Sequence, residues 1–201
     1  MAGPRKPDGI APWQVLESKY SYRDRWLAVR TETVRLPNGT ILSPYHTLEF
    51  PEWVSVIALT PSREIVLVEQ YRHGIKRLSV ELPSGNQDDP AEDMLDAARR
   101  EFREETGYAA EEWHRLGSAT TNTSRQSNRL HFFLALDARK VTEQALDPGE
   151  MIDIRFIPWT EFLADVTDGT LEIPGHHLAG LWKLRAFAKR TADPRLLALN
   201  L

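Results

Sequence analysis

Residues 100–108 of this chain read Arg-Glu-Phe-Arg-Glu-Glu-Thr-Gly-Tyr and contain three closely spaced carboxylates, Glu101, Glu104 and Glu105. Spacings of three and four residues place all three on one face of a helix. Carboxylates this close repel one another unless a cation neutralises them. A solvated acidic face would explain a single pair of glutamates, but oxygen ligands in this number suit Mg²⁺ or Mn²⁺. The stretch therefore predicts a divalent-metal site on a helix.

The ends of this helix can be predicted from the residues around it. Asp89 is a suitable N-cap, Pro90 fits the first helical position, and Glu92 stands where a capping-box carboxylate reaches back. Gly107 suits the left-handed position that ends a helix. Apolar residues recur between these ends and predict a buried stripe of Met94, Leu95, Ala98 and Phe102. The face that carries Ala97 and the three glutamates is expected to point away from the core.

The wider pattern resembles the signature of the Nudix hydrolase family. In that signature a Gly and a Glu precede Arg-Glu, an apolar residue, any residue, Glu-Glu, any residue, Gly and a second apolar residue. Residues 92–108 match every fixed position, with Phe102 and Tyr108 in the apolar slots. One departure is that six residues rather than five separate Gly85 from Glu92. Because the extra residue precedes the helix cap, it is expected to change the path of the loop without shifting the register of the glutamates.

The resemblance extends upstream of the signature. Residues 69–72, Glu-Gln-Tyr-Arg, and residues 81–85, Glu-Leu-Pro-Ser-Gly, look like the segment that leads into it in the ADP-ribose and nucleoside-diphosphate-sugar pyrophosphatase branch. In that branch the Arg and the Glu contact the substrate, and a backbone carbonyl before the Gly completes the metal site. The resemblance thus implies substrate contacts from Arg72 and Glu81 and a metal ligand from the Ser84 carbonyl. A surface ion pair is the alternative for Arg72.

The resemblance also implies roles for the remaining site residues. The metal ligands are expected to be Ser84, Glu101, Glu104 and Glu105, and the catalytic residues Glu104, Glu105, Arg100 and Glu150. Arg100 would orient a carboxylate by a charge-assisted hydrogen bond. Glu150 resembles an acidic loop position that some members use as a base, although Asp147 and Asp153 lie close to it in the sequence.

Three other groups of residues each have a functional and a structural explanation. Trp53 and Trp26 could stack on a nucleobase, but tryptophans at sheet edges commonly just pack. His176 and His177 lack a third ligand at metal spacing and are better explained as the start of a helix. The stretch 120–129 lacks the proline usual in this branch, so the resemblance specifies the substrate less closely than the chemistry. Its polar side chains could hydrogen-bond a sugar or a phosphate, or the stretch is a solvated loop.

The order of strands and helices predicts an α/β fold, the Nudix α/β/α sandwich with a mixed sheet. Strands are expected at 53–60, 65–71, 113–119, 129–136 and 152–158, and helices from 160 and over about 177–190. The last helix should bury Leu178, Leu181, Trp182, Leu184 and Phe187. A Nudix domain over 51–201 is expected to follow a flexible tail at 1–12 and a small antiparallel β region at 13–50. In that region 37–40 forms a hairpin turn between 26–36 and 41–50. By resemblance, this region makes a homodimer.

The composition limits the cellular location and the classes of binding partner that we expect. The 201 residues are 41% hydrophobic, enough for one core, and the formal net charge is −4, which gives no general attraction to nucleic acid or to an anionic membrane. No cysteine is present, and residues 1–12 lack the apolar core of a signal peptide. We therefore expect a cytoplasmic protein with a small-molecule nucleotide as its partner.

The function that the resemblance implies is metal-dependent hydrolysis of a diphosphate linkage. ADP-ribose is the first expected substrate and a nucleotide sugar such as GDP-mannose the second, with a nucleoside monophosphate and a sugar phosphate as products. Dinucleoside polyphosphates and capped RNA are less favoured because no basic groove is predicted. The alternative is a nucleotide-sugar sensor of Nudix fold that binds without turnover. The intact carboxylates argue against the sensor, and residues 191–201 are too few for an appended winged helix.

Overall fold

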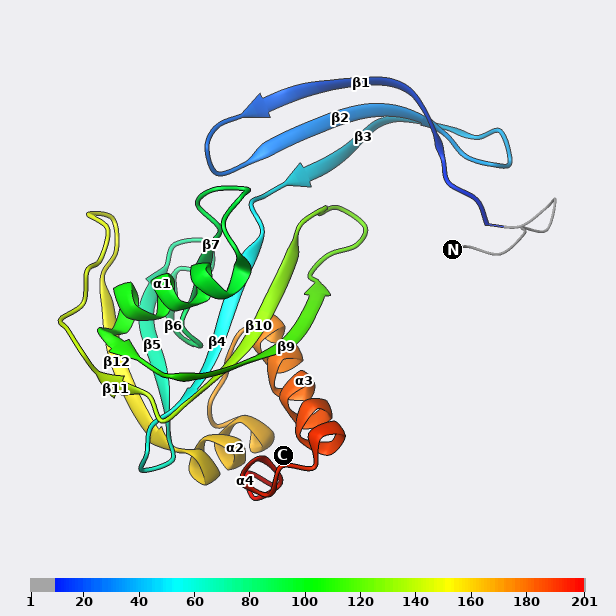
Figure 1. Ribbon diagram of the computed structural model, residues 1–201. Coiled ribbons are helices and arrows are strands. Elements are labelled where there is room, and N and C mark those ends of the chain that lie inside the picture. The colour runs from blue at the N-terminus through cyan, green and yellow to red at the C-terminus, as the bar shows by residue number, and fades with distance from the viewer. Residues whose placement is uncertain (1–9, 201) are drawn as a thin grey trace. The chain divides into compact units, whose positions relative to one another are not determined.

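The computed structural model of the protein describes residues 10–200 (Figure 1). Of the tail expected at 1–12, residues 1–9 lie outside the described residues. The chain divides into two compact units. The smaller unit combines the residues up to Pro51 with Thr120–Asn128, and the larger unit combines Glu52–Ala119 with the residues from Arg129 onward. No helix in the described part of the chain is long and apolar enough to cross a membrane.

The larger unit is built on a mixed sheet in which the strand order is β12-β5-β4-β10-β9. Strands β4 and β10 are parallel, whereas β5 runs antiparallel to both β4 and β12. Two short strands lie off this path, because β6 pairs with β5 and β7 pairs with β4. The bounds are β4 Trp53–Leu59, β5 Glu64–Arg72, β6 Arg77–Glu81, β7 Ser84–Asn86, β9 Glu112–Thr120, β10 Arg129–Leu136 and β12 Ile152–Pro158. A separate two-stranded ladder joins β8 (Tyr108–Ala109) to β11 (Arg139–Lys140).

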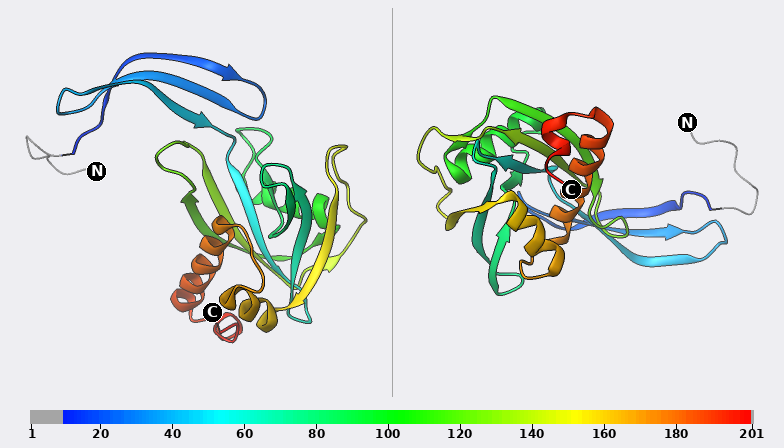
Figure 2. Two further views of the ribbon diagram at one scale, coloured as in Figure 1. Left: turned by 180° about the vertical axis from the view of Figure 1, so that it is seen from behind. Right: turned by 90° about the horizontal axis from the view of Figure 1, so that it is seen from below.

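Helices cover both faces of this sheet (Figures 1 and 2). In β4, Val54 and Val56 point towards α1 (Met94–Thr106), and Ile57 and Leu59 point towards the C-terminal helices. Those helices are α2 (Trp159–Asp168), α3 (Gly175–Thr191) and α4 (Pro194–Leu197). The alternation of side chains along the strand thus supplies two separate cores. The predicted α/β/α sandwich with a mixed sheet is confirmed.

Strands β4 and β5 separate along their length. They pair directly only where Ala58 meets Val66 and Leu59 meets Ile65. Towards the other end, β4 takes β7 as its partner and β5 takes β6. The segment that leaves β6 therefore crosses to β7 and then enters α1, which brings the backbone of Ser84 against that helix.

Helix α1 begins later than the sequence predicted. Its N-cap is Asp93, whose carboxylate accepts a hydrogen bond from Leu95 N at 2.8 Å, so the assignment of Asp89 and Pro90 as cap and first residue was wrong. Asp89 instead closes a separate turn, accepting from Ala91 N at 2.8 Å. The predicted end is confirmed, because Gly107 adopts φ 71° and donates its N–H to the Arg103 carbonyl.

Two predictions about helix faces also need correction. Ala97 on α1 is fully buried against the sheet and does not point away from the core. On α3, Leu181 and Leu184 are buried as predicted, but Leu178 is exposed and Trp182 is 67% exposed. Buried positions on α3 are instead filled by small or polar residues. At Gly180, for example, a Cβ atom would lie 2.8 Å from the ring of Phe132.

The smaller unit is a three-stranded antiparallel sheet in the order β1-β2-β3, with bounds Gln14–Arg23, Ala28–Arg35 and Ile41–Glu49. The predicted hairpin turn joins β2 to β3, with Gly39 at φ 86°. Residues Thr120–Asn128 belong to this unit, although sequence reasoning placed them between two strands of the other domain. Tyr45 Oη donates to the Ser124 carbonyl at 2.7 Å, and Leu48 N donates to the Arg125 carbonyl at 2.7 Å.

Candidate metal-binding and catalytic site

The carboxylates of α1 meet the backbone of β7. Ser84 N donates a 2.8 Å hydrogen bond to Oε2 of Glu105. Gly85 lies directly over Glu101, since a Cβ atom at this position would stand 2.0 Å from the Glu101 Cδ. Glycine is therefore required here for close approach of backbone and carboxylate. The tertiary fold brings together three of the residues that the sequence nominated as metal ligands.

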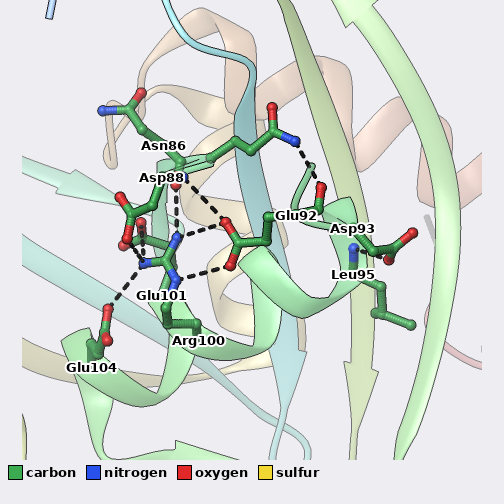
Figure 3. A network of polar contacts seen from close by, with 9 residues as sticks. Asn86, Asp88, Glu92, Asp93, Leu95, Arg100, Glu101 and Glu104 are labelled. Atoms are coloured by element: carbon green, nitrogen blue, oxygen red, sulfur yellow. Dashed lines mark hydrogen bonds and ion pairs between the residues drawn. The ribbon is translucent and has the colours of Figure 1, made fainter. Parts of the chain in front are cut away.

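Arg100 lies at the centre of a network of oxygen acceptors (Figure 3). Its Nη1 donates to Glu101 Oε1 at 2.9 Å and to Glu104 Oε2 at 3.2 Å. Its Nε and Nη2 donate to the two oxygens of Glu92 at 3.1 and 3.2 Å. Nη2 also donates to the Asn86 carbonyl at 3.0 Å. One guanidinium thus connects the loop before α1 to two of the three glutamates.

Burial sets the electrostatics of the cluster. Desolvation raises the pKa of Glu101 to about 7, although the charge and hydrogen bond of Arg100 partly offset it. Burial also raises the pKa of Glu105 well above its usual value, against the hydrogen bond from Ser84 N, and the charge of Glu101 raises it further. Glu105 is only 4% exposed, so the sequence-based view of an exposed cluster was wrong for this residue. In the metal-free protein, burial therefore favours the protonated forms of Glu101 and Glu105, and Arg100 offsets this only in part at Glu101.

The donor set fits a hard divalent cation. Three carboxylates and a backbone segment supply oxygen atoms only, which Mg²⁺ and Mn²⁺ prefer. Within residues 10–200 no three acidic or histidine side chains already converge as a ligand set. The reason is local, because Arg100 holds Glu101 and Glu104 while Ser84 N holds Glu105. A cation that took the oxygens in these contacts would draw Glu101 and Glu104 away from Arg100.

Arg72 and Glu81 form a forked ion pair between β5 and β6. Nε of Arg72 donates to Oε1 at 2.9 Å and Nη2 donates to Oε2 at 2.6 Å. Burial acts to raise the pKa of Glu81, but Arg72 outweighs it and holds this pKa below its usual value. The charge of Glu105 contributes to the raised pKa of Arg72, so the pair is electrostatically linked to the carboxylate cluster.

Trp53 and the two histidines named in the sequence analysis form one cluster, and Ser55 is the member that the sequence analysis missed. The rings of Trp53 and His176 pack at 4.9 Å between centroids, and those of His176 and His177 at 4.2 Å. His177 is fully buried and its Nδ1 lies 3.1 Å from the Ser55 hydroxyl. The histidine pair lies in the first turn of α3, in agreement with the prediction that it begins a helix. The polar Ser55 inside an otherwise apolar strand was the available signal.

The last two candidates are more exposed. Glu150 lies in an exposed loop, where its carboxylate accepts from Asp147 N at 3.1 Å. Its charge nevertheless contributes to the raised pKa of Glu105. Trp26 is 50% exposed in the smaller unit, and the Arg25 guanidinium lies 4.0 Å from its ring centroid.

Comparison with known proteins identifies similar domains and relatives. Residues 50–173 match the NUDIX domain family, and residues 13–48 match the nucleoside diphosphate sugar hydrolase N-terminal domain. The chain is 32% identical over 142 residues to the methanol dehydrogenase activator of Bacillus methanolicus, covering 70% of this chain and 76% of the relative. It is 32% identical over 124 residues to an ADP-ribose pyrophosphatase of Bacillus subtilis (strain 168), covering 61% of this chain and 66% of the relative.

A third relative spans more of the chain. An ADP-ribose pyrophosphatase of Mycobacterium tuberculosis (strain ATCC 25618 / H37Rv) is 27% identical over 184 residues, covering 91% of this chain and 88% of the relative. A crystal structure of an ADP compounds hydrolase superposes with a TM-score of 0.78 at 20% identity and covers 92% of this chain and 98% of that chain. This structural likeness supports the fold.

Proposed function

Since the chain belongs to the Nudix hydrolase family, we propose that it hydrolyses the diphosphate linkage of a nucleoside diphosphate joined to another moiety. ADP-ribose is the first substrate, supported by the two relatives that carry its name. A nucleotide sugar such as GDP-mannose is the second, supported by the match of residues 13–48. The observation that carries the proposal is the meeting of α1 and β7, which gathers Glu101, Glu105 and Ser84.

The residues of the site have different roles in the proposed reaction. Glu101, Glu104, Glu105 and the Ser84 carbonyl would hold Mg²⁺ or Mn²⁺. A bound ion of this kind neutralises the diphosphate oxygens and lowers the pKa of a water molecule. Until a cation binds, Arg100 orients Glu101 and Glu104 through charge-assisted hydrogen bonds. Glu150 is a candidate general base, because its exposed carboxylate can pass a proton to solvent and its charge reaches Glu105.

Arg72, Glu81 and Trp53 are proposed to bind the substrate. Arg72 uses Nε and Nη2 for Glu81, and its side chain is 40% exposed, so the donors on Nη1 can reach a phosphate or a ribose hydroxyl. Glu81 fixes the guanidinium for that contact. Trp53 packs one side of its ring on His176, which holds the ring in place for stacking on a base.

We also propose that the chain acts as a homodimer through its smaller unit. Strand β1 is exposed along almost its whole length and carries the half-exposed apolar side chains of Val15, Tyr20 and Tyr22. Apolar surface of this kind commonly marks a protein interface. Light scattering on the eluting peak of a size-exclusion column would test this, and a molecular mass near 23.0 kDa would contradict the dimer.

The reaction is tested by its products. ADP-ribose with Mg²⁺ should yield AMP and ribose 5-phosphate, and in ¹⁸O-labelled water the label should enter one of these phosphomonoesters because water attacks phosphorus. ADP with free ribose would indicate glycosidic cleavage and contradict the proposal. Binding of ADP-ribose without any product would favour the sensor, and turnover in excess chelator would remove the metal from the mechanism.

A further inference from the structure

The loop between β7 and α1 contains the residue by which this chain departs from the Nudix pattern, and the structure shows how that loop is held. Gln87 N donates to the Glu52 carbonyl at 2.9 Å, and Gln87 Nε2 donates to the Glu92 carbonyl at 2.7 Å. Asp88 N donates to Oε2 of Glu92 at 3.2 Å. These contacts place the Asp88 side chain beside Arg100 (Figure 3).

Asp88 shares one nitrogen of Arg100 with two glutamates of the site. Its Oδ2 lies 3.3 Å from Nη1, the nitrogen that also contacts Glu101 and Glu104. Nη1 carries two N–H groups, so three carboxylates compete for two protons. The other nitrogens, Nε and Nη2, are engaged by Glu92 and the Asn86 carbonyl.

If Glu101 and Glu104 rotate to bind a cation, Nη1 of Arg100 loses both of its hydrogen-bond acceptors. The Arg100 side chain is 24% exposed, so a guanidinium nitrogen left without an acceptor is costly. Among the described residues, Asp88 is the remaining carboxylate within ion-pair distance of Nη1. Its own side chain is 73% exposed and free to adjust.

We propose that Asp88 is a positioning residue that takes over Nη1 of Arg100 and thereby frees Glu101 and Glu104 for a divalent cation. The inference deepens the proposed function, on which it rests for the presence of the cation. Asp88 acts through Arg100 and contacts neither substrate nor metal. Asp88, in the loop that is one residue longer than the Nudix pattern, thus supports the metal site without entering it.

Manganese affinity of the full-length chain tests this inference, measured from the electron paramagnetic resonance signal of free Mn²⁺. Asp88→Ala should weaken binding by about three- to tenfold, the effect of losing one partly exposed charge-assisted contact. Asp96→Ala is the matched control, because Asp96 is an exposed carboxylate of α1 that pairs with Arg99 and not with Arg100. It should leave the affinity within about twofold of the wild type, as expected for an exposed pair.

A double-mutant cycle separates action through Arg100 from direct attraction of the cation. In an Arg100→Gln background, Asp88→Ala should have no further effect on Mn²⁺ affinity. An undiminished effect there, or wild-type affinity for Asp88→Ala alone, would overturn the inference. If circular dichroism shows that Arg100→Gln does not fold, Arg100→Met keeps the aliphatic stem and takes its place.

Failure of the inference about Asp88 can be distinguished from failure of the proposed function. Hydrolysis of ADP-ribose combined with unchanged Mn²⁺ affinity in Asp88→Ala rejects only the role of Asp88. Absence of hydrolysis for every diphosphate tested rejects the proposed function, while the binding cycle still reports on Asp88 and Arg100.

Discussion

Two glutamates of this protein are almost completely covered from solvent, and their pKa values are shifted in opposite directions. Glu81 is 2% exposed and Glu105 is 4% exposed. The pKa of Glu81 is lowered because a forked pair with Arg72 outweighs its burial, whereas the pKa of Glu105 is raised because burial outweighs a single backbone N–H. Burial alone therefore does not decide the charge state of a carboxylate, and the available partner does. Glu81 is paired with a cationic side chain of the protein, and Glu105 is the one that we propose to bind a metal ion from solution.

The largest expected effect comes from removing the charge of Glu105. Glu105→Gln should lower kcat by at least about a hundredfold, because it deletes a proposed metal ligand while the amide oxygen can still accept from Ser84 N. Steady-state hydrolysis of ADP-ribose with Mg²⁺ measures the loss. Glu143→Gln is the control, since Glu143 pairs with Lys140 at the surface. Wild-type turnover in Glu105→Gln would remove Glu105 from the metal site.

Removing the partner of Glu81 should chiefly affect stability and substrate affinity. Arg72→Ala leaves a buried carboxylate unpaired and should lower the free energy of unfolding by about 2 kcal/mol, less than for a fully buried pair because Arg72 is partly exposed. It should also raise KM more than it lowers kcat. Urea denaturation and steady-state kinetics measure the two effects.

Arg77→Ala provides the comparison for Arg72→Ala. Arg77 pairs with Glu172 at the surface, where both side chains are more than half exposed. Its loss should change the free energy of unfolding by less than about 0.5 kcal/mol. Equal losses of unfolding free energy in the two variants would contradict the expectation that the Arg72–Glu81 pair contributes more to stability than a surface pair.

A smaller effect is expected from closing the space over Glu101. Gly85→Ala places a Cβ atom 2.0 Å from the Glu101 Cδ, so the carboxylate must move away from β7. We expect a loss on the order of tenfold in kcat/KM, as is typical of small displacements at a reacting centre. The Glu81 pair should be unaffected, so the unfolding free energy at pH 7 should change less than in Arg72→Ala. Unchanged kcat/KM would mean that this contact is not needed for activity.

The pH dependence of stability should separate the two kinds of glutamate. Glu101 and Glu105 have raised pKa values in the folded state, so their protonated carboxyl groups stabilise the metal-free protein at low pH. This contribution is lost as the pH rises from the unfolded value of 4.5 through about 7 for Glu101, and Glu105, whose pKa is raised well above 4.5, loses it in the same direction. A lowered value, as for Glu81, contributes stability that is present above pH 4.5 and is lost on acidification.

Calorimetry in chelator and in Mg²⁺ would measure this difference. In chelator, Tm should fall by a few degrees between pH 5 and 8, and Glu105→Gln should reduce the fall. Mg²⁺ should raise Tm more at pH 8 than at pH 5, because ionised carboxylates bind it without losing a proton. An identical Mg²⁺ effect at both pH values would contradict the assignment of these glutamates as ligands.

Much of the site could be predicted because it depends on local spacing. The strands β4, β5, β9, β10 and β12 were predicted to within one or two residues, since each is at least seven residues long and contains apolar positions at strand spacing. The short strands β6 and β7 were not predicted, because their partners are distant in the sequence. The N-cap of α1 was misplaced for a similar reason. Asp89 and Asp93 both suit the position, and contacts of Glu92 with Arg100 and Asp88 favour the later start.

The sequence by itself determined that Glu101, Glu104 and Glu105 share a helix and that Gly107 ends it, because helical geometry repeats every few residues. The order of strands and helices also predicted an α/β/α sandwich with a mixed sheet. Only the tertiary structure decided that Glu105 is buried against Ser84, that Glu81 is neutralised by Arg72, and that Asp88 reaches Arg100. These outcomes depend on desolvation and on partners contributed by other strands and loops, which no local pattern specifies.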